Sequence, residues 1–163
     1  MNKKKILIIA IAVVLVLAIA LTTLYIFFAP GDFRRAKWGM SMSQVKSRES
    51  AELIKEEYAS LSYPITSLEG IDFNTTAFYN FNAETDELTH VSMGLSSSTF
   101  DDKKIARLVS TLEEKYGEPE KSEVSEIRYD YKWETKRTRI FIKQLYSYTL
   151  VIYEDVTIPP DAE

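Results

Sequence analysis

The feature that most constrains this chain is an unbroken apolar run at residues 6–29, which contains no Asp, Glu, Lys or Arg. A helix rises about 1.5 Å per residue, so the run would be about 36 Å long and would cross a hydrocarbon core of about 30 Å. Three lysines at residues 3–5 precede it, and such clusters stay on the cytoplasmic side of a membrane. We therefore expect a single-pass protein of the cell membrane, with residues 1–5 cytoplasmic, a transmembrane helix at 6–29 and the rest of the chain extracytoplasmic.

A cleaved secretory signal is the alternative interpretation of this run, because such signals also begin with positive charge followed by apolar residues. The run exceeds the usual apolar region of about 7–15 residues. It ends in Phe27-Phe28-Ala29 and is followed directly by Pro30, which is not a small-x-small cleavage site. These features favour a retained anchor. A lipid anchor is excluded because the chain has no cysteine.

Composition limits what the rest of the chain can be. About 130 residues follow the apolar run, enough for one domain with its own core. The whole chain has a net charge of −4, and the part after the run carries −7 because the three lysines precede it. Such an acidic domain argues against binding to nucleic acid and against adhesion to anionic lipid. Without cysteine there is no disulfide framework, so the fold depends on its core alone.

The part after the run is expected to consist of a short juxtamembrane linker, one domain and a tail. The linker covers residues 30–37 and contains a turn signal, Pro30-Gly31-Asp32. The extracytoplasmic domain covers residues 38–156, and the tail covers residues 157–163. Trp38 is expected in the core of the domain, with a position at the membrane interface as the alternative.

Two helices are predicted in this domain. Ser41 followed by Gln44 forms a capping box, so a short helix begins there. The second helix runs from Asp101 to Tyr116, where apolar residues recur at helical spacing and a glycine and a proline follow the last turn. Its single apolar stripe has to cover a sheet, because two such helices cannot form a core by themselves.

Six strands are predicted from runs in which apolar and polar residues alternate. The fourth run has the most regular alternation, and Pro64 assigns the first run to a sheet edge. Short polar turns join the second and third runs into a hairpin and the last three into a meander. The runs lie at residues 60–66, 73–81, 88–95, 127–134, 138–144 and 148–152.

Two sequence patterns frame residues 33–155. The first reads Phe33-Arg34-x-x-Lys37-Trp38-Gly39-Met40-Ser41-x-x-Gln44-Val45-Lys46-x-x-Glu49, and the second reads Leu112-x-x-Lys115-Tyr116-Gly117-x-Pro119 with a later tryptophan-bearing strand around Trp133. Together they resemble small bacterial envelope domains of the beta-lactamase-inhibitor-protein-like and BamE-like kind. The resemblance implies an α+β domain that serves protein–protein contact or envelope assembly, and it implies no catalytic residues. Many such domains are lipoproteins anchored through a cysteine, which this chain lacks.

The expected fold class is therefore α+β. An N-terminal transmembrane helix is followed by one domain, in which two helices pack on an antiparallel sheet of about six strands. Each half of the domain consists of a helix and then about three strands, which suggests an internal repeat.

No catalytic, cofactor-binding or metal site is predicted. His90 is the only histidine and lies in a strand, with no cysteine and no His-Glu spacing to form a metal site. Adjacent carboxylates at residues 101–102 and 113–114 point in different directions on a helix. The five glycines form no phosphate-binding loop, and no Gly-x-Ser-x-Gly motif is present. We therefore expect a protein that is not an enzyme and needs no cofactor.

One sheet face is expected to remain uncovered by the helices. The residues assigned to it combine aromatic and basic groups, as protein-binding patches do. The alternative is ordinary scattered exposure or a covering loop. The predicted partner-binding residues are Phe78, Arg139, Phe141, Lys143, Val151 and Tyr153.

Two classes of function follow. The first is a non-catalytic protein-interaction module of the bacterial cell envelope, which binds a protein partner or a second copy of itself through this face. The alternative is an extracytoplasmic sensor of a small ligand or signal, or a weak enzyme, which needs a concave pocket that sequence does not reveal.

Overall fold

The computed structural model describes residues 11, 13–19, 31–98, 100–125, 128–145 and 147–158. The chain divides into two units, Met1–Gly31 and Asp32–Glu163. In the first unit, residues 11 and 13–19 are helical, and their large apolar side chains are exposed.

The prediction of a membrane-spanning helix is corrected by the structure. Among the residues that it describes, no helix has the length and apolar character needed to cross a membrane. The predicted transmembrane helix at 6–29 is thereby contradicted, and with it the signal anchor, the single-pass topology and the assignment to the cell membrane. Most of the range 6–29 lies outside the described residues.

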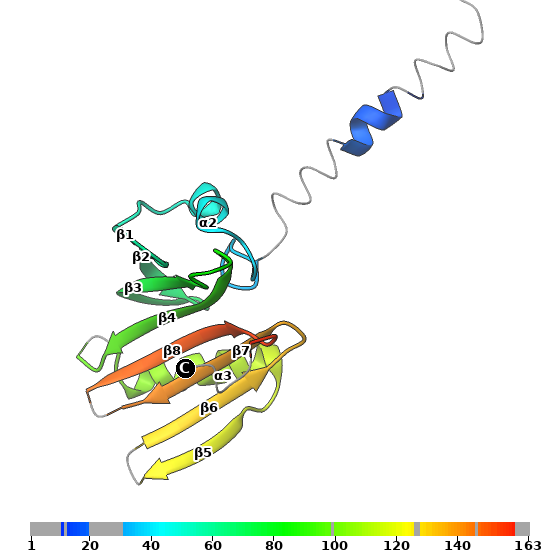
Figure 1. Ribbon diagram of the computed structural model, residues 1–163. Coiled ribbons are helices and arrows are strands. Elements are labelled where there is room, and N and C mark those ends of the chain that lie inside the picture. The colour runs from blue at the N-terminus through cyan, green and yellow to red at the C-terminus, as the bar shows by residue number, and fades with distance from the viewer. Residues whose placement is uncertain are drawn as a thin grey trace, which may run out of the picture. The chain divides into compact units, whose positions relative to one another are not determined.

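The described part of the second unit contains an antiparallel sheet of eight strands (Figure 1). The strand order is β1-β2-β3-β4-β8-β7-β6-β5, so each half is a four-stranded meander and the halves join where β4 pairs with β8. The strands are β1 Lys55–Glu57, β2 Ser60–Leu68, β3 Ile71–Phe81, β4 Leu88–Ser96, β5 Glu120–Ser125, β6 Arg128–Glu134, β7 Thr138–Gln144 and β8 Tyr148–Asp155.

The prediction of about six strands is wrong, because eight are present in the described residues. The two missed strands, β1 and β5, are the two edges of the sheet. β1 reads Lys-Glu-Glu and all three residues are exposed, and β5 contains one apolar residue in six. Charged edge strands oppose pairing with another chain, and they lack the alternation from which strands are predicted. The six predicted strands correspond to the other six, although Ile127 lies outside the described residues.

Pro64 lies in β2, which is the second strand and not an edge strand. β1 pairs only with Ser60–Ser62, and the carbonyl oxygen of Ser62 accepts a hydrogen bond from the amide of Ile54 on that side. Because residues two apart in a strand direct their backbone groups to the same side, the nitrogen of Pro64 faces the side where β1 has already ended. The missing N–H of proline therefore interrupts no pairing among the described strands.

Both predicted helices of this unit are confirmed. Helix α2, Met42–Arg48, begins after a complete capping box of Ser41 and Gln44. Helix α3, Asp102–Tyr116, begins after the N-cap Asp101 and ends at Gly117, whose φ of 88° is accessible to glycine without strain. Each half of the sheet is thus preceded by one helix, so the repeat contains four strands and not three.

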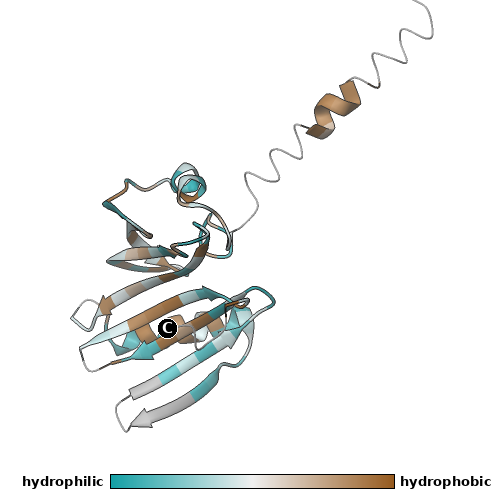
Figure 2. Ribbon diagram, viewed as in Figure 1, coloured by the Kyte–Doolittle hydropathy of each residue, from teal (hydrophilic) through white to brown (hydrophobic). Residues whose placement is uncertain are grey.

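One face of the sheet packs against the helices and forms the core; we call it the covered face. Its central row of cross-strand neighbours is fully buried and joins the helical residues Val45, Leu108 and Leu112 in one cluster. In Figure 1, α3 lies behind β7 and β8, and Figure 2 shows hydrophobic residues gathered in β4, β7 and β8. The row runs through Leu61, Tyr79, Val91, Tyr153, Ile140 and Trp133.

The segment before α2 belongs to this core. Phe33 is 3% exposed, and its ring centroid lies 5.7 Å from that of Tyr79 and 4.9 Å from that of Tyr153. The indole N–H of Trp38 donates to the hydroxyl of Thr138 at 2.9 Å, which confirms the core position predicted for this tryptophan. Residues 33–38, most of which were expected as linker, therefore contact strands from both halves of the sheet.

Candidate functional site

The opposite side of the sheet, which we call the open face, is the candidate site. Among the described residues, neither helix packs on it, and its side chains follow from the same register as the core. Across the central strands, Phe78 lies opposite Ser92, Ser92 opposite Ile152, and Ile152 opposite Phe141. The next row contains Gly94, Leu150 and Lys143, and Lys132 of β6 lies beside Phe141.

Apolar side chains on the open face remain partly accessible. Phe78 is 41% exposed and Tyr148 is 45% exposed, whereas Leu150, Ile152 and Phe141 are half-buried. A sheet with one solvated face usually carries polar residues there, so a row with apolar side chains at three of its four positions across the central strands is unusual. Exposed apolar patches of this kind mark interaction surfaces.

The six residues predicted for this face do not all lie on it in the structure. Phe78, Phe141 and Lys143 lie on the open face. Val151 and Tyr153 belong to the covered face, where they are 0% and 3% exposed. Alternation in β8 predicts Tyr148, Leu150 and Ile152 as core residues, whereas the register places them on the open face.

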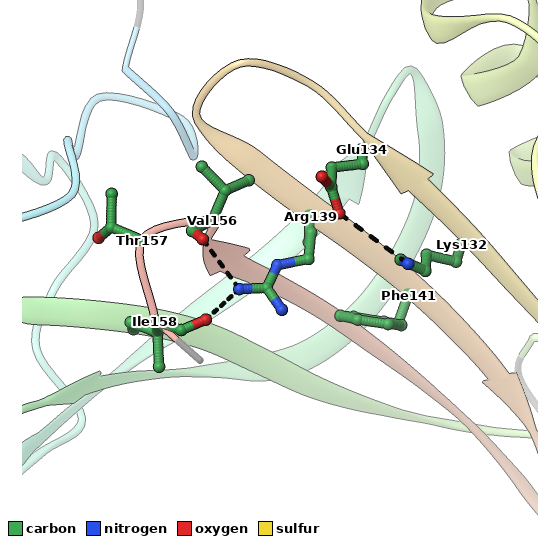
Figure 3. Close-up of a pocket in the computed structure, with 7 residues that line it drawn as sticks. All are labelled: Lys132, Glu134, Arg139, Phe141, Val156, Thr157 and Ile158. Atoms are coloured by element: carbon green, nitrogen blue, oxygen red, sulfur yellow. Dashed lines mark hydrogen bonds and ion pairs between the residues drawn. The ribbon is translucent and has the colours of Figure 1, made fainter. Parts of the chain in front are cut away.

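Arg139 lies on the open face by register, but its side chain is only 6% exposed. Its Nη1 lies 3.0 Å from Oε1 of Glu154. Its Nη2 donates to the carbonyl oxygens of Asp155, Val156 and Ile158. These bonds hold the segment after β8 against one end of the open face (Figure 3), so we assign Arg139 a structural role and not partner binding.

A pocket of about 380 Å³ lies at this end of the open face (Figure 3). Phe141, Val156 and Ile158 supply its apolar walls, and the polar groups come from neighbouring strands and from the segment after β8. The ammonium group of Lys132 lies between two carboxylates, 3.3 Å from Glu120 and 3.9 Å from Glu134. The lining residues are Lys132, Glu134, Arg139, Phe141, Val156, Thr157 and Ile158.

A buried charged cluster lies on the covered face. The side chain of Glu49, the C-cap of α2, is 1% exposed; its Oε1 accepts a hydrogen bond of 2.6 Å from the Tyr79 hydroxyl, and its Oε2 lies 3.5 Å from Nη1 of Arg34. Burial, followed by the charge of Glu49 and the hydrogen bond to it, raises the pKa of Tyr79 well above its usual value. The cluster connects the end of α2 to β3, which indicates a structural role.

Tyr153 is the second buried tyrosine of this face. Its hydroxyl is buried and has no hydrogen-bond partner in the described part of the chain. Burial, with smaller contributions from Glu69 and Tyr116, raises its pKa well above the usual value for tyrosine.

His90 lies in β4 on the open face, between Asn80 and Glu154 in register, and its Nδ1 is 3.2 Å from the hydroxyl of Thr89. Within the described ranges, no three His, Cys, Asp or Glu side chains are close enough to hold a metal ion. The features of the open face that can serve binding are therefore its apolar row and its lysines.

Comparison of the chain with protein-family models, with curated proteins and with solved structures gives no match. The resemblance to small bacterial envelope domains therefore stays a prediction.

Proposed function

We propose that the second unit is a protein-binding domain whose open face contacts another protein. The observation that carries the proposal is the row formed by Phe78, Ser92, Ile152 and Phe141, which is apolar at three of its four positions on a face that no described helix covers. Protein interfaces consist of an apolar, aromatic centre within a polar rim. Lys132 continues the row in β6, Lys143 lies in the row on one side of it, and Asn80 and His90 lie in the row on the other side.

The separation of this row from the core also supports the proposal. The buried cluster that holds the fold together lies on the covered face and already includes apolar side chains from the sheet and both helices. Apolar residues on the open face are not needed to complete that cluster. These side chains would be removed from water when a partner binds, and the removal of apolar area from water drives association.

Site-specific photo-crosslinking tests the proposal. A photoreactive phenylalanine analogue is introduced at position 78 of the full chain in the cells that naturally produce it. Tyr58 is 87% exposed and lies in the turn between β1 and β2, so the same analogue at position 58 is the matched control. We expect a discrete protein adduct from position 78, its loss when Phe141→Glu is added, and no such adduct from position 58.

Folding of the Phe141→Glu protein has to be checked alongside by circular dichroism, because Phe141 is half-buried. We expect the fold to be retained. Equal adducts from positions 58 and 78, or an adduct that persists in the folded Phe141→Glu variant, would contradict a binding role for the open face.

A further inference from the structure

The three basic side chains around Phe141 differ in whether a carboxylate neutralises them. Arg139 is occupied by Glu154 and by backbone carbonyls, and Lys132 lies between Glu120 and Glu134. Lys143 differs from both. Among the described residues, no carboxylate forms an ion pair with Lys143, although Asp130 is its cross-strand neighbour. Its ammonium group lies 5.6 Å from the centroid of the Phe141 ring, which is within reach of a cation–π contact.

The pocket described above lies beside the same ring, toward Arg139, and we call it the recess. Phe141, Val156 and Ile158 supply its apolar walls, and Lys143 is not among the residues that line it. Its volume of about 380 Å³ is near the lower end of the range for ligand pockets, about 300–1,000 Å³. A recess of this size holds one apolar side chain, and binding energy at protein interfaces concentrates where such an anchor fills a pocket.

Strand geometry fixes the spacing of Phe141 and Lys143. Phe141 and Lys143 are two residues apart in β7 and on the same face, so they are separated by about 7 Å along the strand. An extended segment lying along β7 presents its own alternate side chains at the same interval. One of its residues then lies over Phe141 and directs its side chain into the adjoining recess, while the residue two positions away lies over Lys143.

We propose that the occupant of the open face is an extended segment of a partner protein in which an apolar anchor and an Asp or Glu are two residues apart. This inference rests on the proposed function. The anchor, a Phe or Leu side chain, enters the recess beside Phe141, and the carboxylate pairs with Lys143. Covering Lys143 without supplying a negative charge would remove its hydration with no compensation, so the partner has to bring the carboxylate.

Selection from a random linear peptide library displayed on phage tests this chemistry on the full chain. We expect enriched peptides to carry an acidic residue two positions from an aromatic or branched aliphatic residue. A synthetic peptide of this pattern should bind about tenfold more weakly to Lys143→Glu than to the unchanged chain. Replacing its acidic residue with Lys should restore binding to that variant. Lys136 is exposed in the turn between β6 and β7, so Lys136→Glu is the matched control and should bind the original peptide normally.

The outcomes separate this inference from the function on which it rests. If enriched peptides lose binding in Phe141→Glu but bind Lys143→Glu as well as the unchanged chain, the acidic-anchor pattern is overturned while binding by the open face stands. If the chain self-associates in sedimentation and Phe141→Glu makes it monomeric, the occupant is a second copy and the inference is overturned. If no enriched peptide depends on Phe141, the inference also fails, and the crosslinking at position 78 decides the proposed function separately.

Discussion

The two faces of the sheet use the same strands for different purposes. On the covered face, the cross-strand neighbours Ile142 and Val151 are completely buried and belong to the core cluster that includes helical residues. One residue away on the open face, Phe141 and Ile152 are also cross-strand neighbours, but both keep contact with solvent. The difference teaches that apolar character alone does not identify the core of this sheet. Which apolar residues stabilise the fold depends on which face the register assigns to the helices.

The largest expected effect is a difference in stability between adjacent residues of β7. Ile140→Ala removes buried methyl groups and leaves a cavity, so we expect it to lower the free energy of unfolding by about 3 kcal/mol. Phe141→Ala removes a half-buried ring that faces solvent and should cost about 1 kcal/mol. Urea denaturation of the two variants measures the difference. Equal losses would mean that both faces belong to the core and would remove the distinction between them.

The next effect contrasts two tyrosines of the covered face. Tyr79→Phe removes the hydroxyl that donates to the buried Glu49, so we expect a loss of about 2 kcal/mol at pH 7. Tyr153→Phe removes a buried hydroxyl with no partner among the described residues and should leave stability unchanged or slightly increased. Thermal denaturation compares them, with Tyr148→Phe on the open face as the control. A substantial loss in Tyr153→Phe would reveal a partner for that hydroxyl.

The smallest effect concerns alkaline pH. Burial raises the pKa of Tyr79 and of Tyr153 in the folded chain above the ordinary value of 10.0. The two protonated tyrosines therefore contribute fully to the free energy of unfolding below about pH 10. This contribution is lost as the pH rises from there toward their pKa in the folded chain. Each tyrosine should account for about 1 kcal/mol between pH 10 and pH 11.

Denaturation of the unchanged chain and of Tyr153→Phe over this range isolates one of these contributions, because all other titrating groups are shared. We expect a shallower decrease in the variant. Parallel curves for the unchanged chain and Tyr153→Phe would show that this tyrosine ionises equally easily in both states.

Much of the fold was predictable because local signals are strong in the middle of the sheet. The capping box at Ser41, the N-cap Asp101 and the ending at Gly117 correctly bound the two helices. Six strands follow from alternation. The edge strands β1 and β5 were not predictable in this way, because charged residues protect the edges of a sheet from further pairing and at the same time remove the alternating pattern. The prediction for residues 6–29 depended on the length of an apolar run without charged residues and on the three lysines before it, and the structure contradicts it.

The composition of the open face was only partly predictable, and the error lies in one strand. β8 carries apolar residues at both its odd-numbered and its even-numbered positions, so alternation does not decide which of the two sets is buried. The pairing of β7 with β8 does decide it. The amide of Leu145 donates to the carbonyl of Tyr148, and counting outward from this pair brings Val151 opposite Ile142. The recess beside Phe141 was not predictable, since it depends on three carbonyl groups that converge on Arg139.

The order of the strands has a consequence for how the chain folds. Every pairing in the described sheet joins strands that are consecutive along the chain, except the pairing of β4 with β8. Formation of that pair closes a long loop that contains α3 and three strands, and the entropic cost of closure grows only slowly with loop length. The search for native contacts is therefore local within each half and has a single non-local step. That step brings together Tyr79 of the first half and Tyr153 of the second, and Phe33 contacts both rings. The segment before α2 therefore also stabilises the contact between the two halves of the sheet.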